Sequence, residues 1–184
     1  MAKNEFQYAN DFCEKFPFLN LPQSSIVVAL SVAALVMPVF FHSQSFPNQL
    51  IVGTVVNTLL ALCALFLTFR NSLPVILIPS IAALISGYVF GSFTIFLAFL
   101  IPFIWAGNAL YVYAIKRLAV AGKTNYGISV IAASFLKAAL IGGATLVLVS
   151  IGVVPAALLV PMGVVQFATA VVGGLVAGAA LFVK

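Results

Sequence analysis

Acidic residues are almost missing from this sequence, and their distribution is informative. The 184 residues include only three, Glu5, Asp11 and Glu14, and no acidic residue follows. Charged residues of both signs make up 6% of the chain, against roughly 25% in a soluble domain. Hydrophobic residues make up 64%, which is more than a soluble fold of this length can bury. The composition therefore predicts an integral membrane protein.

Histidine and cysteine are also scarce, which argues against several kinds of site. His42 is the single histidine, and Cys13 and Cys63 are the only cysteines. We therefore expect no metal site, no cofactor and no structural disulfide. The basic residues are too sparse for a nucleic-acid surface.

The apolar runs predict an all-α bundle of about six transmembrane helices, since one span needs about 20 residues. The stretch 73–115 is almost continuously apolar, and we expect it to turn at Tyr88, Gly91 and Ser92. Without that turn the count falls to five. The spans are predicted at 25–41, 50–69, 73–90, 93–115, 127–150 and 157–182.

The basic residues agree with six spans and predict the orientation. With six spans, all the basic residues outside the spans fall on one side of the membrane, and the opposite loops contain neither Lys nor Arg. Basic residues favour the cytoplasmic side, so both termini are expected in the cytoplasm of a cell-membrane protein. These residues are Lys3, Lys15, Arg70, Lys116, Arg117, Lys123 and Lys184.

Residues 1–22 form a separate element ahead of the transmembrane domain, 23–184. Phe6, Phe12 and Phe16 recur at helical spacing among polar residues, which predicts a short amphipathic cytoplasmic helix. This helix could lie on the inner membrane surface or dock on a partner protein. The alternative is that it packs on its own bundle.

Lys137 is the most unusual residue, because it falls near the middle of the predicted fifth span. A charge there costs about 2.5–3.5 kcal/mol or more, and no acid in the membrane part can pair with it. Three compensations are open: an anionic ligand, an acid on a partner subunit, or snorkelling toward the cytoplasm. A further alternative is that the amine is neutral. Ser134 shares its helix face, but no acid orients the pair, so we do not expect an enzyme.

Polar amides accompany Lys137 in the otherwise apolar spans. Asn57, Asn108 and Gln166 lie inside the second, fourth and sixth spans, and the first outer loop, 42–49, is polar. An apolar wall with a few polar groups is what a small-molecule site needs. Bonding between helices is the alternative role for each amide.

Two further patterns concern packing. Small residues at i, i+4 predict close helix contacts, and tyrosines near the predicted span ends are typical of the aromatic belt at a membrane surface. The small residues are Ala29, Ala33, Ala139, Gly143, Ala170, Gly174 and Gly178, and the tyrosines are Tyr88, Tyr111, Tyr113 and Tyr126.

Taken together, the chain resembles the substrate-binding S components of energy-coupling factor (ECF) transporters. It shares their size and six-span plan, and Ala29-x-x-x-Ala33 resembles the alanine motif of that family. The stretches QLIVGTVVNTLLAL at 49–62 and IPFIWAGNALYVY at 101–113 are similar to segments of small S-component-like membrane proteins.

This resemblance implies a subunit that binds a vitamin or metal ion in an outward-facing pocket, and that works with a transmembrane scaffold and two ATPases. Ala29 and Ala33 would dock on the scaffold. A small organic substrate is expected, because the metal-binding members have histidine-rich N-termini and this chain begins MAKNEF. The implied substrate-binding candidates are His42, Asn48, Gln49, Asn57, Lys137 and Gln166.

Two other classes of function stay open at this point. One is a membrane structural or assembly protein without a small ligand, in which Lys137 faces lipid headgroups or a protein partner. The other is a stand-alone carrier or channel, which the lack of acidic relay residues disfavours.

Overall fold

We analysed a computed structural model of the chain. It describes residues 23–40, 48–87 and 89–179. The predicted leader, 1–22, and His42 lie outside the described residues.

Six α-helices follow one another in the described part of the chain, which contains no strand, so the predicted all-α class is confirmed there. Short 3-10 or π-helical turns at Arg70–Ser72, Gly91–Phe96, Lys116–Ala121, Ala156–Leu158 and Pro161–Val165 lie between or before them. The helices are α2 (Gln23–Phe40), α3 (Asn48–Phe66), α4 (Leu73–Ser86), α5 (Leu97–Ile115), α6 (Tyr126–Ser150) and α7 (Gln166–Ala179).

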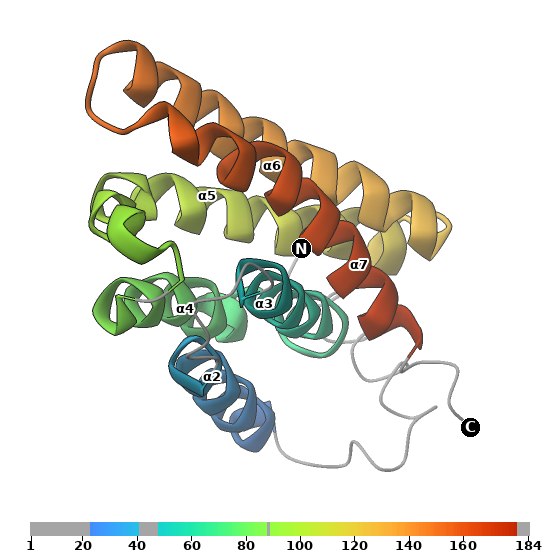
Figure 1. The fold of residues 1–184 in the computed structure, drawn as a ribbon. Coiled ribbons are helices and arrows are strands. Elements are labelled where there is room, and N and C mark those ends of the chain that lie inside the picture. Colours follow the sequence, from blue (N-terminus) through green and yellow to red (C-terminus); the bar gives the residue numbers. More distant parts are fainter. Residues whose placement is uncertain (1–22, 41–47, 88, 180–184) are drawn as a thin grey trace.

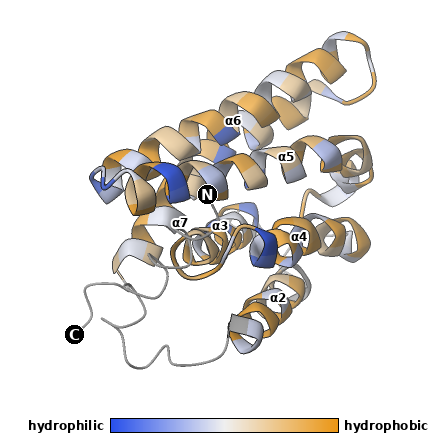
Figure 2. Ribbon diagram, turned by 180° about the vertical axis from the view of Figure 1, so that it is seen from behind, coloured by the Kyte–Doolittle hydropathy of each residue, from blue (hydrophilic) through white to orange (hydrophobic). Residues whose placement is uncertain are grey.

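Four helical segments are long and apolar enough to cross a membrane: Gln49–Phe66, Gly91–Ala121, Tyr126–Ser150 and Ala156–Ala179. Two further apolar segments, Ser24–Met37 and Arg70–Ser86, are shorter. Hydrophobic residues make up most of each helix (Figure 2), and many large ones are exposed on the outside, such as Ile85, Phe135 and Val164. The molecule is therefore a membrane-embedded helical protein.

The predicted turn within the long apolar stretch is present, but it begins earlier than expected. The third span was predicted to run to residue 90, whereas α4 ends at Ser86. Gly87 follows with φ of 73°, and Gly91 has φ of 56°. Glycine adopts such left-handed conformations without the steric penalty of a Cβ, so Gly87 ends the helix.

The helices pack in neighbouring pairs across the bundle. The most extensive contacts join α3 with α7, α5 with α6, and α2 with α4. In Figure 1, α2 and α6 lie at opposite edges, and α3, α4, α5 and α7 lie between them. Among the described elements, α2 packs mainly against α4, with fewer contacts to α3 and the turn Arg70–Ser72, and much of its length has exposed side chains.

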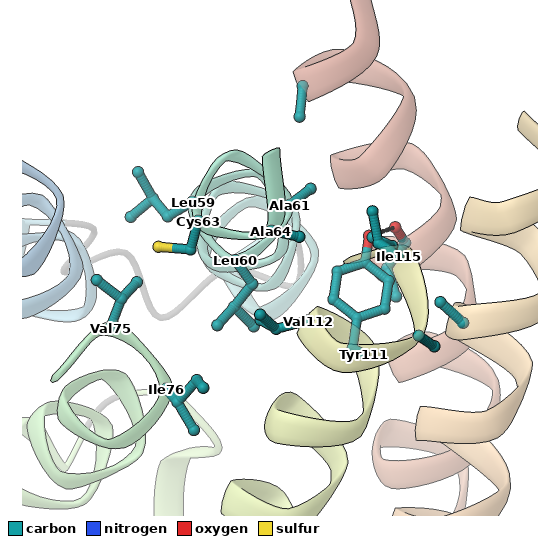
Figure 3. Close-up of a cluster of buried hydrophobic side chains, with 14 of the residues drawn as sticks. Leu59, Leu60, Ala61, Cys63, Ala64, Val75, Ile76, Tyr111, Val112 and Ile115 are labelled. Atoms are coloured by element: carbon teal, nitrogen blue, oxygen red, sulfur yellow. Dashed lines mark hydrogen bonds between the residues drawn. The ribbon is translucent and has the colours of Figure 1, made fainter. Parts of the chain in front are cut away.

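Two hydrophobic clusters fill the two ends of the bundle interior. One gathers side chains of α3, α4 and α5, among them Leu60, Ile76 and Val112, which converge in Figure 3. The other joins Leu100 of α5 and Ile141 of α6 with residues near the start of α7. The buried polar residues described below lie between these clusters.

Small residues let α7 approach its neighbours closely, as predicted for Ala170, Gly174 and Gly178, which are all buried. A Cβ built on Gly174 would lie 2.6 Å from the Tyr111 hydroxyl, and one on Gly178 would overlap the Tyr126 ring. By contrast, Ala139 and Gly143 are exposed, so the contact predicted for them is absent from the described part of the bundle.

Gly173 provides a direct test of this packing. A Cβ there would lie 2.7 Å from the Thr54 carbonyl oxygen and the Thr58 amide nitrogen of α3. Backbone atoms cannot move aside as a flexible side chain can, so we expect Gly173→Ala to lower the free energy of unfolding by about 1–3 kcal/mol. Thermal unfolding in detergent would measure the change.

Gly143→Ala on α6 is the matched control, because nothing lies within 4 Å of a Cβ at that position. Alanine also favours a helix by about 1 kcal/mol over glycine. We expect this variant to be as stable as the wild type or slightly more so. Equal stability of the two variants would contradict the close α3–α7 contact.

Candidate functional site

One cavity opens between α3, α4, α5, α6 and α7. Its volume is about 70 Å³, and one water molecule needs roughly 10–15 Å³ on the same measure. Most of its wall is apolar, with residues such as Val52, Val56 and Ile104. The polar residues in the wall are Gln49, Asn57, Ser80, Asn108, Lys137, Gln166 and Thr169.

Lys137 reaches this cavity from the middle of α6. Its side chain is 2% exposed, and its stem passes Gly107 of α5, where a Cβ would lie 3.5 Å from Lys137 Cγ. The Nζ atom donates a hydrogen bond to Oδ1 of Asn57 on α3. Lys137 therefore does not snorkel to a membrane surface, which was one of the three compensations considered from the sequence.

Asn57 is held in one orientation by its own partners. Its Nδ2 donates to the Gly53 carbonyl oxygen at 2.8 Å and to the Thr169 hydroxyl at 3.2 Å. Both are acceptors, so the amide nitrogen faces them and Oδ1 faces the lysine. Because Asn57 is 1% exposed, this network fixes the position of the amine inside the bundle.

Tyr111 forms the other contact of the lysine and corrects a prediction. We expected Tyr111 in an aromatic belt at the membrane surface, but it is fully buried, and its hydroxyl donates to the Ala170 carbonyl oxygen at 2.8 Å. Lys137 Nζ lies 5.5 Å from the centre of the Tyr111 ring, within the range of a cation–π interaction. Because Tyr111 falls near the end of a predicted span, its contact with Lys137 was not indicated by the sequence.

Asn108 and Ser80 line the wall on the side of α5 and α4. Asn108 is 2% exposed and donates from Nδ2 to the Ile76 carbonyl oxygen at 3.2 Å. The Ser80 hydroxyl accepts a 2.7 Å hydrogen bond from Nε1 of Trp105, the only tryptophan in the chain. These bonds fasten α4 to α5 beside the cavity.

Gln49 and Gln166 lie at the starts of α3 and α7, and both line the cavity. A π-helical turn, Pro161–Val165, precedes Gln166. Nε2 of Gln49 lies 3.5 Å from the Pro161 carbonyl oxygen, at the limit of a hydrogen bond. Such π turns occur often at functional sites.

The cavity lies toward the end of the bundle that is remote from the basic residues of the described connections between helices. Its wall combines the first halves of α3 and α5, the start of α7 and the end of α4. Arg70 follows α3, and Lys116, Arg117 and Lys123 follow the last turn of α5. The basic residues and the cavity are thus at opposite ends of the same helices.

The structure gathers four of the six substrate-binding candidates around this cavity: Gln49, Asn57, Lys137 and Gln166. Asn48 is the first residue of α3, and His42 falls outside the described residues. The wall also contains Ser80, Asn108 and Thr169, which were not among those candidates. Asn108 could have been chosen from the sequence, because it is a polar amide within an apolar span. Nothing in the sequence distinguishes Ser80 or Thr169 as candidates.

The two alanines assigned to partner docking lie on α2 at unequal depth. Ala29 is exposed, whereas Ala33 is half-buried against the cluster around α3. The outward face of α2 also carries Val28 and Val32, which are 61% and 52% exposed. Lipid or a partner subunit can cover such an apolar face equally well.

Comparison of the chain with protein-family models, curated proteins and solved structures finds no match.

Proposed function

We propose that this protein is a membrane-embedded subunit that binds a small organic molecule in the cavity beside Lys137. The observation that carries this proposal is a buried lysine, held by Asn57, in the wall of an otherwise mostly apolar cavity. Buried charges in membrane helices usually mark substrate or ion pathways. A purely structural bundle gains nothing from this charge, since apolar packing there would be cheaper.

We further propose that all six helices cross the cell membrane and that both termini are cytoplasmic. The positive-inside rule supports this orientation. The cavity then opens away from the cytoplasm, as an importer of an external nutrient needs. Following the resemblance to ECF S components, a transmembrane scaffold and ATPase subunits would complete the importer, with Ala29 and Ala33 of α2 at the scaffold.

Blocking the cavity tests the binding role. Ala83 of α4 lines the cavity and is 7% exposed, so Ala83→Phe would fill part of the space with a ring. We expect native mass spectrometry of the gently solubilised, tagged chain to detect a stoichiometric small molecule on the wild type. Its occupancy should fall at least about tenfold in the variant, as expected when about 1.4 kcal/mol of affinity is lost.

Ala139→Phe is the matched control, because Ala139 of α6 is exposed on the outer face of the bundle. It should keep the wild-type adduct. The same spectra report retained subunits, so a scaffold-plus-ATPase assembly would support the importer. A chain that carries only lipid, unchanged by Ala83→Phe, would favour the structural or assembly alternative.

A further inference from the structure

The charge of Lys137 has no opposite charge near it. No residue of the described part is Asp or Glu, and the other polar residues in the cavity wall are amides or hydroxyls. An ammonium group has three donors. Asn57 accepts one of them, and the Tyr111 ring adds a weaker attraction. Both partners are neutral, so the site has donor capacity and one positive charge left over.

The amine is also preorganised for a ligand. Asn57 is locked by Gly53 and Thr169, and the lysine stem is confined beside Gly107. A ligand group that meets this amine need not order a long, flexible side chain, which is a major cost of binding by lysine. A charge-assisted hydrogen bond in a low-dielectric interior is stronger than one between neutral groups.

We propose, on the basis of the binding role above, that the ligand carries one carboxylate, which pairs with Lys137, on an otherwise uncharged body. One negative charge neutralises the site. A phosphate ester carries about −1.5 to −2 charges at pH 7, and its excess charge would be buried without a partner among the described residues. Asn108 and Gln166 line the same cavity and can serve uncharged polar groups of the ligand.

The end of the ligand that enters the cavity carries the carboxylate and is otherwise small and apolar. The volume of about 70 Å³ is about half that of a cavity of roughly 150 Å³ that binds a benzene ring, so it admits a carboxylate and a short stretch of chain. Val52, Val56 and Ile104 line it. A water-soluble carboxylic acid and a fatty acid of the bilayer share this chemistry. The identity of the bound molecule separates these two sources.

The test is a comparison of the small molecules that copurify with the full-length chain. Wild type, Lys137→Met, Lys137→Arg and Ala83→Phe are purified in parallel in mild detergent, extracted with solvent, and analysed by mass spectrometry in both ionisation modes. We expect a monocarboxylic acid in the wild-type extract. It should be depleted about a hundredfold in Lys137→Met and at least about tenfold in Ala83→Phe, and partly restored in Lys137→Arg. The primary amide of the same acid, added to the purified wild type, should not bind.

Other outcomes separate the two proposals. If the wild type instead carries a neutral molecule or a phosphate ester that is lost in Ala83→Phe, the carboxylate inference is overturned and the binding role stays intact. The same holds if wild type and Lys137→Met retain equal amounts of the acid. Extracts of wild type and Ala83→Phe that do not differ would overturn both. A fatty acid that depends on Lys137 would support the carboxylate inference and contradict uptake of a soluble nutrient.

Discussion

Replacing Lys137 with methionine is expected to abolish ligand binding while the bundle stays folded. Methionine matches the lysine stem in length and apolar character, so it fits beside Gly107. It removes the ammonium that is hydrogen-bonded to Asn57. Losing one partner of a buried charge pair costs about 3–5 kcal/mol, which corresponds to an affinity loss of roughly 10²-fold to 4 × 10³-fold. Isothermal titration of the purified variant with the copurified ligand would measure this loss.

Lys123→Met is the control for the loss of a positive charge, because Lys123 is exposed in the α5–α6 connection. It should bind as the wild type does. Elution as a single monodisperse species and an unchanged helical circular dichroism spectrum would establish that Lys137→Met is folded. Normal affinity in a folded Lys137→Met chain would contradict the role given to the amine.

The stability of the same variants separates a functional lysine from a structural one. Lys137→Met alone leaves Oδ1 of Asn57 without its donor, whereas Lys137→Met combined with Asn57→Leu removes both polar partners. Replacing a buried polar pair by apolar residues is often neutral or stabilising by about 1–4 kcal/mol. We expect the double variant to unfold at or above the wild-type temperature. A large loss of stability in the double variant would favour the structural alternative.

The fold could be predicted because lipid leaves few choices. Long apolar runs in a membrane have to be helical, since each backbone group needs an internal partner. Each predicted span overlaps one of the helices α2 to α7, and four of the six overlap segments that are long and apolar enough to cross a membrane. The ends were less predictable. Gly87 and Gly91 were both available to end the third helix, and only the backbone geometry shows that it ends before Gly87.

The polar centre was predicted only in part. Lys137 and the amides Asn57 and Gln166 stand out because polar side chains are costly in a span, so their grouping around one cavity could be anticipated. Thr169 and Ser80 could not, because a threonine or serine in a membrane helix usually bonds to its own backbone. Thr169 does this and also accepts from Asn57. The second contact depends on how α3 packs against α7. This packing brings together residues far apart in the sequence, so a local sequence pattern does not predict it.

Cysteine labelling from the two sides of the membrane should give an all-or-none pattern that tests the proposed topology. In a chain with Cys13→Ser and Cys63→Ala, single cysteines are introduced as Leu73→Cys, Ser92→Cys and Ala121→Cys. All three positions are exposed in the structure. We expect a membrane-impermeant maleimide to label the cysteine at 92 in intact cells. The cysteines at 73 and 121 should react only after the cells are permeabilised.

The labelling pattern also decides whether the short helix α4 crosses the membrane. Its 14 residues span about 21 Å at 1.5 Å per residue, whereas the hydrocarbon core is about 30 Å thick. The turn Arg70–Ser72 and the segment after Gly87 therefore have to cover the remaining depth. Labelling of positions 73 and 92 from the same side would mean that α4 is re-entrant and that the six-span count is wrong. A fully inverted pattern would keep the count but open the cavity to the cytoplasm, which an importer of external nutrients does not need.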